Sequence, residues 1–296
     1  MNRDSYEAVV SRLFPDSALR SASRLAGGVS ADVYRLDVDR SDGGTQSVVL
    51  RVHGAAHHGH PADLEYRLLQ ALRRAGLPVP EPLFVDTSGA LLKAPFLVTG
   101  FIEGTSEIPL AKAEQRIASM AELLAQIHRL PTGPLPALPE RLDPLPEVFD
   151  FLPHGTEWSA LRAHLRSLTD TAYRGPARLL HGDFWPKNLL WQDGRIAGVL
   201  DWEDAALGDP LSDVACSQVE LRYQLGKPAM ERFARAYALH QAIDTERLAL
   251  WQVYVAAAAQ HFMGSWGLAP TLESHMRAEA LHSIRDAAAM LITANR

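Results

Sequence analysis

The sequence is poor in cysteine and in long apolar runs. Its 296 residues include one cysteine, Cys216, so no disulfide can form within the chain, which is typical of a reducing compartment. Apolar runs such as VYVAAAA are far shorter than the roughly 18 residues of a membrane span. The start, MNRDSYEAVV, lacks the apolar core of a signal peptide. We therefore expect a cytoplasmic protein without a membrane partner.

Basic residues are also few. The chain has 29 Lys and Arg residues against 35 Asp and Glu residues, a formal net charge of −6. A nucleic-acid partner would require a basic face, so we expect none. The content of 47% hydrophobic and 22% charged residues is that of an ordinary globular protein. The length suits one large domain or two lobes, and a monomer and a homodimer both remain open.

The first hundred residues have the pattern of an antiparallel sheet that carries one helix. SASRLAGGVSADVYRLDV predicts a strand, a glycine turn and a second strand, and QSVVLRV follows the turn SDGGT. PADLEYRLLQALRRAG predicts a helix with Pro61 in its first turn and Gly76 at its end. Two further strands are expected in EPLFVDTSGALLKAPFLVTGFIEG, around the turn TSGA.

The pattern becomes mainly helical after Gly104. AKAEQRIASMAELLAQIHRL is amphipathic, a helix is expected from about Glu157 to Tyr173, and short strands flank the turn DGR. The chain from Asp209 to the C-terminus has helical periodicity. The sequence thus predicts an α+β, bilobal fold: a β-rich lobe over residues 1–103 and an α-rich lobe over residues 104–296.

Three polar residues stand out in the second half. HGDFWPKN contains Asp183 and Asn188, and GVLDWED contains Asp201 after an apolar strand. Phosphoryl transfer needs a carboxylate that positions and deprotonates the attacking hydroxyl, and oxygen ligands for Mg²⁺. Asn188 cannot act as a base, so metal ligation suits it better, as it does Asp201. Alternatively, the two acids are ordinary turn and strand-end residues. His181 is expected to orient the loop.

The order of these motifs resembles the aminoglycoside phosphotransferase (APH) family, small-molecule kinases with a protein-kinase-like fold. HGDFWPKN followed by LDWEDAALGDPLSDVA carries the resemblance, which extends over about residues 20–290. It implies that Asp183 is the catalytic base, assisted by His181 and Asn188, and that Asn188 and Asp201 bind Mg²⁺. Within GDPLSDVA, we interpret Asp209 and Asp213 mainly as helix-start residues.

The resemblance also assigns nucleotide contacts to the first lobe. In LAGGVSADVYRL, Gly27, Gly28 and Ser30 would lie nearest the phosphates, although a plain hairpin would explain this pattern as well. In SVVLRV, Arg51 stands where the kinase pattern V-A-I-K has lysine, and we expect it to serve the phosphates and to pair with Glu65.

Adenine and acceptor contacts leave weaker signals. In kinase-like folds, the backbone between the two lobes binds the adenine. The resemblance therefore implies adenine contacts by backbone groups near Thr99, Phe101 and Ile102, where the last strand of the first lobe ends. Family resemblance makes three residues of the C-terminal helices acceptor candidates: Glu220, His261 and Trp266. HGAAHHGHP holds four histidines (His53, His57, His58 and His60), which we interpret as a mobile loop rather than a metal site.

These residues predict a kinase that uses ATP or GTP, with Mg²⁺, to phosphorylate a hydroxyl of a small molecule. Aminoglycosides, sugars and choline-like acceptors are all compatible with the sequence. The alternative is a nucleotide-binding pseudokinase or regulator on the same fold. Arginine at position 51 and the lack of a GxGxxG loop favour that alternative, whereas the complete set of Asp183, Asn188 and Asp201 favours the enzyme.

Overall fold

The computed structural model describes residues 1–25, 31–54, 57, 59–145 and 147–294. The chain divides into two compact units. The first unit comprises Met1–Thr105, Gly133–Ala137 and Leu189–Asp204, and the second comprises Ser106–Thr132, Leu138–Asn188 and Ala205–Arg296. Asp201 therefore belongs to the same unit as Arg51, whereas Asp183 and Asn188 belong to the other unit.

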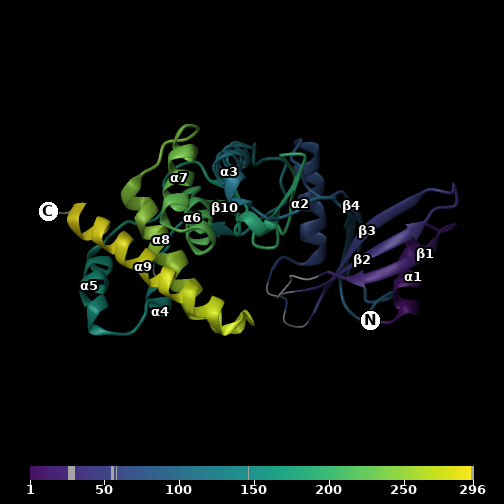
Figure 1. The fold of residues 1–296 in the computed structure, drawn as a ribbon, viewed down its shortest axis with the longest axis horizontal. Helices are drawn as coiled ribbons and strands as arrows, with labels where there is room; N and C mark the ends of the chain where they lie inside the picture. Colours follow the sequence, from purple (N-terminus) through teal and green to yellow (C-terminus); the bar gives the residue numbers. More distant parts are fainter. Residues whose placement is uncertain (26–30, 55–56, 58, 146, 295–296) are drawn as a thin grey trace. The chain divides into compact units, whose positions relative to one another are not determined.

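A five-stranded antiparallel sheet forms the centre of the first unit, in the order β1-β2-β3-β5-β4 (Figure 1). The strands are β1 (Ala18–Arg24), β2 (Ala31–Asp39), β3 (Thr45–His53), β4 (Pro82–Asp86) and β5 (Phe96–Gly100). Two helices, α1 (Arg3–Leu13) and α2 (Ala62–Arg74), accompany it. The antiparallel sheet of the predicted α+β fold is confirmed.

Alternating apolar residues build the core of this sheet. Leu36 and Val38 of β2 are fully buried, as is Leu50 of β3, and they pack with Val9 and Val10 of α1. Each such side chain contributes about 1.5–3 kcal/mol by leaving water. Because successive strand residues point to opposite faces, burial of Leu50 puts its neighbour Arg51 on the other face.

A hairpin completes the first unit. Strands β8 (Leu189–Gln192) and β9 (Arg195–Val199) pair so that Leu189 lies opposite Val199. Asp193 and Gly194 both have positive φ, 50° and 79°, which is the backbone of a tight two-residue hairpin turn. Val199 N–H donates to the Pro78 carbonyl at 2.7 Å, which attaches the hairpin to the segment before β4. Asp201 follows directly after this anchored strand.

Helices dominate the second unit (Figure 1). They are α3 (Ala113–Ile127), α4 (Val148–Phe151), α5 (Ser159–Ser167), α6 (Leu211–Leu225), α7 (Lys227–Ala238), α8 (Thr245–Phe262) and α9 (Pro270–Ala294). The short strands β6 (Glu140–Arg141), β10 (Ala206–Gly208) and β7 (Arg178–Leu180) form a small sheet. Single 3₁₀ turns span Leu110–Lys112, Thr156–Trp158, Pro186–Asn188 and Met263–Ser265. Apolar faces of α5, α6, α8 and α9 enclose the core of this unit.

Two local predictions differ from the structure. The helix expected from Glu157 to Tyr173 is α5 and ends at Ser167, because Leu168 takes an extended ψ of 137°. Strands β6 and β10 were not expected from the sequence. They are two and three residues long, too short for the alternation of apolar and polar residues that identifies a strand.

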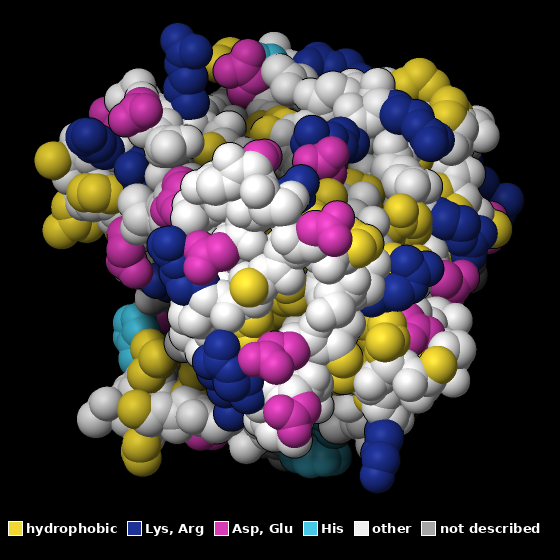
Figure 2. Space-filling view, turned by 90° about the vertical axis from the view of Figure 1, so that its right-hand side faces the viewer, with side chains coloured by type: hydrophobic (Ala, Val, Ile, Leu, Met, Phe, Trp, Pro, Cys, Tyr) yellow, Lys and Arg dark blue, Asp and Glu magenta, His cyan; other side chains and the backbone are white. Residues whose placement is uncertain are grey.

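The surface and the helices agree with the composition. On the face seen in Figure 2, basic and acidic side chains are interspersed among the residues drawn. Within the described part of the chain, the helices that are long enough to cross a membrane are not apolar enough to do so.

Gly208 of β10 provides a test of this small sheet. A Cβ atom at this position would lie 2.0 Å from the Arg141 carbonyl oxygen, so strand β6 would have to move. We expect Gly208→Ala to cost about 2–3 kcal/mol of unfolding free energy and to lower Tm by about 5 °C or more. Gly133→Ala is the control, since a Cβ at Gly133 meets no atom within 4 Å. Equal Tm values for both variants in thermal unfolding would contradict the assigned strand pairing.

Candidate functional site

The loop that carries Asp183 turns sharply after β7. Gly182 has a φ of 89°, a backbone conformation that side chains with a Cβ rarely adopt. The 3₁₀ turn Pro186–Asn188 closes the loop, and β8 begins at the next residue. The sharp turn explains why a glycine stands between His181 and Asp183.

Asp183 is held in one orientation by its own loop. Its Oδ2 atom accepts hydrogen bonds from Trp185 Nε1 at 3.1 Å and from Asn188 Nδ2 at 2.9 Å. Its Oδ1 atom lies 3.8 Å from Cys216 Sγ of α6. The side chain is only partly buried. One carboxylate oxygen is thus fixed by two N–H donors, and the residue as a whole is partly exposed.

Asn188 is oriented by the same contacts. Its Nδ2 atom donates to both the side chain and the backbone carbonyl of Asp183, each at 2.9 Å. An amide that donates through nitrogen on one side presents its oxygen on the other. The arrangement therefore leaves the Asn188 oxygen pointing away from Asp183.

His181 lies beneath the loop and is fully buried. Its Nδ1 atom accepts a hydrogen bond from the Asp183 backbone N–H at 3.2 Å, and its ring meets Phe184 edge to face with centroids 5.7 Å apart. Burial keeps the imidazole away from solvent. Its contacts suit the orientation of the loop backbone, as the sequence predicts.

Asp213 of α6 anchors the loop from below. Its fully buried carboxylate accepts hydrogen bonds from His181 N at 2.7 Å and Gly182 N at 2.9 Å. His128 Nε2 of α3 lies 3.2 Å away, and His128 Nδ1 lies 2.7 Å from the Tyr237 hydroxyl. Burial raises the pKa of Asp213, but these hydrogen bonds and the histidines outweigh burial and hold its pKa below the ordinary value.

The sequence-based interpretation of Asp213 as a helix-start residue was therefore incomplete. Asp213 does lie in the first turn of α6, but its side chain is committed to the loop backbone. Asp209 accepts from Leu211 N at 3.0 Å, as a helix-start residue would, and also from Trp251 Nε1 at 2.6 Å and Arg247 Nε.

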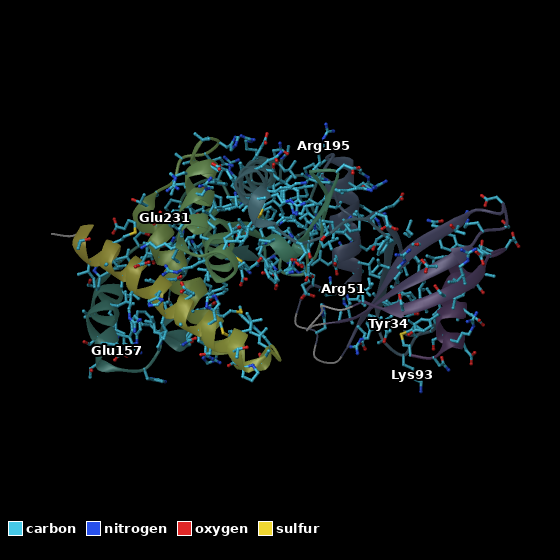
Figure 3. All side chains as sticks on the ribbon, viewed as in Figure 1. Tyr34, Arg51, Lys93, Glu157, Arg195 and Glu231 are labelled. Atoms are coloured by element: carbon cyan, nitrogen blue, oxygen red, sulfur yellow. The ribbon has the colours of Figure 1, made fainter. Side chains whose placement is uncertain are left out.

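Arg51 is the centre of the corresponding polar cluster in the first unit (Figure 3). Its Nη1 atom lies 3.0 Å from Glu65 Oε1 of α2 and 2.9 Å from Asp201 Oδ1, and its Nη2 atom contacts Glu203. A planar guanidinium can reach several carboxylates in fixed directions, which a lysine ammonium cannot. The arginine at this position thus has a structural reason: it is shared by three acids.

Burial makes these ion pairs mutually dependent. The Arg51 side chain is 14% exposed and that of Glu65 is 4% exposed. Burial lowers the pKa of Arg51, but the three carboxylates outweigh burial and raise its pKa. Burial likewise raises the pKa of Glu65, yet Arg51 and His53 outweigh it, and the pKa of Glu65 is lowered. Arg51 and Glu65 therefore stay ionised, since each stabilises the charge of the other.

Asp201 adopts an unusual backbone conformation. Its φ is 63°, in the left-handed region that non-glycine residues rarely occupy. The preceding strand is anchored, and Trp202 Nε1 donates to the Val199 carbonyl at 3.2 Å. A strained, well-supported acidic residue of this kind is a candidate functional residue.

Two histidine side chains of the predicted histidine loop contact this cluster. The His53 and His57 rings stack with centroids 3.9 Å apart, His53 Nε2 lies 3.7 Å from Glu65 Oε2, and His57 Nδ1 lies 3.4 Å from Glu203 Oε2. His53 and His60 are buried, and the interpretation of this segment as a mobile loop stays a prediction. His58 lies outside the described residues. Among described residues, no three His, Cys, Asp or Glu side chains are arranged to hold a metal ion.

The other nucleotide-contact predictions have mixed outcomes. Gly27, Gly28 and Ser30 lie outside the described residues. Thr99 is paired with β3 and β4 on its two sides, and Phe101 N–H donates to the Ser47 carbonyl at 3.2 Å. The Phe101 N–H and the backbone of Thr99 are thus engaged within the sheet, and the adenine contact of these residues stays a prediction. Ile102 follows β5 and packs its side chain against Gly198 of β9.

The acceptor candidates occupy two places in the second unit. Glu220 is on α6, one turn after Cys216. His261 belongs to an exposed aromatic group near the end of α8, with its ring 5.3 Å from Phe151, and Trp266 packs against the helical core. Within the described residues, His261 and Trp266 form no hydrogen bond or ion pair with the Asp183 loop. The structure thus brings Glu220, but not the other two, to the helix that faces Asp183.

Some site residues were not identified from the sequence. Glu203, Cys216 and Asp213 reach the site through contacts between distant segments, which no local pattern reveals. Trp185 was noticed without a role, and its indole N–H proves to orient Asp183. Its position two residues after Asp183 is the feature of the sequence that could have indicated this role.

Comparisons with known proteins agree with this arrangement. A model of the APH phosphotransferase enzyme family matches residues 21–251. Acyl-CoA dehydrogenase family member 10 of Mus musculus is 27% identical over 236 residues, which is 67% of this chain and 21% of that protein. Acyl-CoA dehydrogenase family member 11 of Gallus gallus is 30% identical over 194 residues, 58% of this chain and 25% of that protein. The chain thus corresponds to about a quarter or less of these two relatives.

Solved structures share the fold at low sequence identity. A candidate aminoglycoside phosphotransferase of Ralstonia eutropha JMP134 has a TM-score of 0.72 at 16% identity, covering 99% of this chain and 98% of that one. Aminoglycoside phosphotransferase APH(4)-Ia, in a complex with AMP-PNP and hygromycin B, has a TM-score of 0.65 at 18% identity, covering 96% and 99%. Macrolide 2'-phosphotransferase type I has the same TM-score and identity, covering 94% and 96%. The fold is kinase-like, and the family match over residues 21–251 shows that the chain belongs to the APH phosphotransferase enzyme family.

Proposed function

We propose that this protein transfers the γ-phosphate of ATP or GTP to a hydroxyl of a small molecule. The observation that carries the proposal is the environment of Asp183: one carboxylate oxygen is fixed by Trp185 and Asn188, and the residue is partly exposed to solvent. A general base needs this combination of fixed direction and access. Family membership and the nucleotide and acceptor held by the APH(4)-Ia structure support the same reaction class.

In this proposal the two lobes expected from the sequence divide the work. Residues 1–103 would bind the nucleotide, and residues 104–296 would bind the acceptor and carry Asp183. Arg51 would contact the nucleotide phosphates, so phosphate oxygens compete with Asp201 and Glu203 for its guanidinium. Ile102, after β5, remains the best candidate for an adenine contact.

The residues present fit a magnesium ion. Asn188 and Asp201 would hold it, and both offer oxygen atoms, the ligands that Mg²⁺ prefers. Asn188 uses its nitrogen for Asp183 and keeps its oxygen for another partner. Asp201 uses Oδ1 for Arg51, and its second oxygen can act as a ligand. When bound, the ion neutralises phosphate charge.

The chain's own residues prepare the acceptor hydroxyl. Asp183 accepts a hydrogen bond from this hydroxyl, which aligns its oxygen for in-line attack, and takes its proton as transfer proceeds. Trp185 and Asn188 keep the carboxylate from rotating. Asp213 and His181 hold the loop backbone that carries it.

Asp183→Asn tests the proposed base. Asparagine keeps the shape and can still accept from Trp185, but it cannot take a proton. We expect kcat to fall by about 10²–10⁴-fold, with nucleotide affinity little changed. Nucleoside diphosphate release with a panel of alcohols measures turnover, and calorimetric titration measures nucleotide binding.

Asp193→Asn is the matched control for that variant. Asp193 is exposed in the β8–β9 turn and has a positive φ that asparagine tolerates. Undiminished turnover in Asp183→Asn would contradict the role of Asp183. Magnesium-dependent nucleotide binding without turnover of any acceptor would instead favour the regulatory pseudokinase.

Arg51 offers a second test, of the phosphate-binding half. Arg51→Met leaves three carboxylates without their cation, so we expect about 3–5 kcal/mol lower unfolding free energy and a much higher nucleotide KM. Arg51→Lys keeps the charge but cannot bridge all three acids, so a smaller loss of both is expected. Urea unfolding and nucleotide titration measure these effects. Arg195→Met, an exposed residue of the same unit, is the control. A nucleotide KM unchanged in Arg51→Met would contradict the phosphate contact.

A further inference from the structure

Tyr237 of α7 and His128, the residue directly after α3, form a buried polar contact in the second unit. Helix α7 packs against both α3 and α6 (Figure 1). The Nδ1 atom of His128 lies 2.7 Å from the Tyr237 hydroxyl oxygen, and both side chains are fully buried. Nearby, Gln241 Nε2 donates to the Ala125 carbonyl at 3.1 Å and so attaches the chain after α7 to α3. The two rings are therefore held together by packing and by a neighbouring hydrogen bond.

The contact continues from His128 to the loop that carries Asp183. His128 Nε2 lies 3.2 Å from Asp213 Oδ2, and the same oxygen accepts from the His181 backbone N–H at 2.7 Å. The other oxygen, Oδ1, accepts from the Gly182 backbone N–H at 2.9 Å. Buried hydrogen bonds thus connect this histidine with the backbone that directly precedes Asp183.

The partners of His128 determine which of its ring nitrogens carries hydrogen. Burial raises the pKa of Asp213, but its hydrogen bonds and the neighbouring histidines lower the pKa by more, so the group is a carboxylate. A carboxylate can only accept hydrogen bonds, so His128 Nε2 carries a hydrogen and donates to it. In a neutral imidazole the other nitrogen, Nδ1, is then an acceptor.

Tyr237 supplies the donor that this Nδ1 atom requires. Burial and the nearby charges of Asp213 and Asp209 raise the pKa of Tyr237, so its hydroxyl keeps its hydrogen. Among the described residues, the hydroxyl has no hydrogen-bond partner other than His128. If both nitrogens of His128 carried hydrogen, the Tyr237 O–H would be a buried donor without an acceptor, which is unfavourable. Every group is satisfied when Tyr237 donates to Nδ1 and Nε2 donates to Asp213.

We propose that Tyr237 is a positioning residue for the Asp183 loop, because it holds His128 in the tautomer that donates to Asp213. The hydrogen bond at one nitrogen of a histidine ring determines which nitrogen is protonated. In the opposite tautomer, a bare Nε2 atom would face the carboxylate, and the lone pairs would repel each other. Asp213 would lose one donor, and the loop backbone that it holds would shift. The inference rests on the proposed function, in which Asp183 is the base.

Tyr237→Phe removes the donor and keeps the ring. We expect kcat to fall by about 10–100-fold, because a small displacement of Asp183 misaligns its carboxylate with the acceptor hydroxyl. The nucleotide KM should change little, because Tyr237 acts on the base and not on the nucleotide contacts. Nucleoside diphosphate release measures both constants.

Phe233→Leu is the matched control for that variant. Phe233 is fully buried on the same helix, one turn before Tyr237, and its side chain forms no hydrogen bond. The substitution should lower Tm, since it removes buried apolar volume, without lowering kcat at a temperature at which the protein is folded. Loss of stability is thereby separated from loss of positioning.

NMR tests the tautomer without relying on turnover. The chemical shifts of the imidazole nitrogens distinguish a protonated nitrogen from a bare one, and signals that disappear in His128→Gln belong to His128. We expect hydrogen on Nε2 alone in the wild-type protein and a loss of this preference in Tyr237→Phe. The Trp185 indole N–H, which donates to Asp183 Oδ2, should change its shift in Tyr237→Phe but not in Phe233→Leu.

Two substitutions of His128 separate the roles of its two nitrogens. Glutamine places an amide N–H near the position of Nε2, whereas the shorter asparagine reaches only the position of Nδ1. His128→Gln should therefore retain much more of kcat than His128→Asn does. Tyr237→Phe should not lower kcat further in the His128→Gln background, because Tyr237 acts through the ring that has been replaced.

Any of four results would overturn the inference. They are an unchanged kcat in Tyr237→Phe, hydrogen on Nδ1 but not on Nε2 of wild-type His128, equal kcat in the two His128 variants, and a further loss of kcat when Tyr237→Phe is added to His128→Gln. If Tyr237→Phe does not fold, the wild-type spectrum and the two His128 variants decide. Failure of the phosphotransfer itself looks different: no nucleoside diphosphate is released, while the tautomer and the Trp185 signal behave as expected.

Discussion

The loop that carries Asp183 depends on the buried carboxylate of Asp213. A fully buried charge is tolerated only when hydrogen-bond donors surround it, and two of its donors are the backbone N–H groups of His181 and Gly182. These N–H groups cannot move away without leaving the charge unpaired. The loop conformation is therefore enforced by electrostatics, and the direction of Asp183 follows from it. His128 completes the donor set and ties α3 to the same charge.

The first unit also contains a buried charge that its neighbours compensate, but here the buried group is a cation. Arg51 is a buried cation, and three carboxylates compensate it. Removing one partner of such a cluster is far more costly than any single surface ion pair, since an uncompensated buried charge remains. That constraint is consistent with the arginine, because a guanidinium spreads five N–H donors over a wide planar fork that reaches Glu65, Asp201 and Glu203 together. A lysine here would need a different arrangement of acids.

The sequence predicts the residues that lie in local motifs. The HGDxxxxN spacing, the apolar strand before Asp201 and the five-stranded sheet follow from turn chemistry and alternation, which are local. The sequence places Asp213 correctly in the first turn of its helix. It does not reveal the hydrogen bond from Gly182 N–H to Asp213, because the two residues are 31 positions apart. Glu203 and Cys216 were missed for the same reason. The adenine contacts near Thr99 and Phe101 stay a prediction, because backbone recognition leaves no side-chain pattern and the end of β5 cannot be located from an apolar run alone.

The charge clusters around Asp213 and Arg51 are more constrained than the partly exposed edge of α6 at Cys216 and Glu220. Asp213 and Arg51 are buried and bound on several sides, so substitution of either disturbs many groups at once. Glu220 and Cys216 occupy the one edge of α6 where a side chain meets solvent before the last turn. A substitution there leaves no buried charge of Asp213 or Arg51 unpaired. This edge can therefore vary in sequence while both charge clusters are retained, which agrees with the general rule that one fold carries different sites.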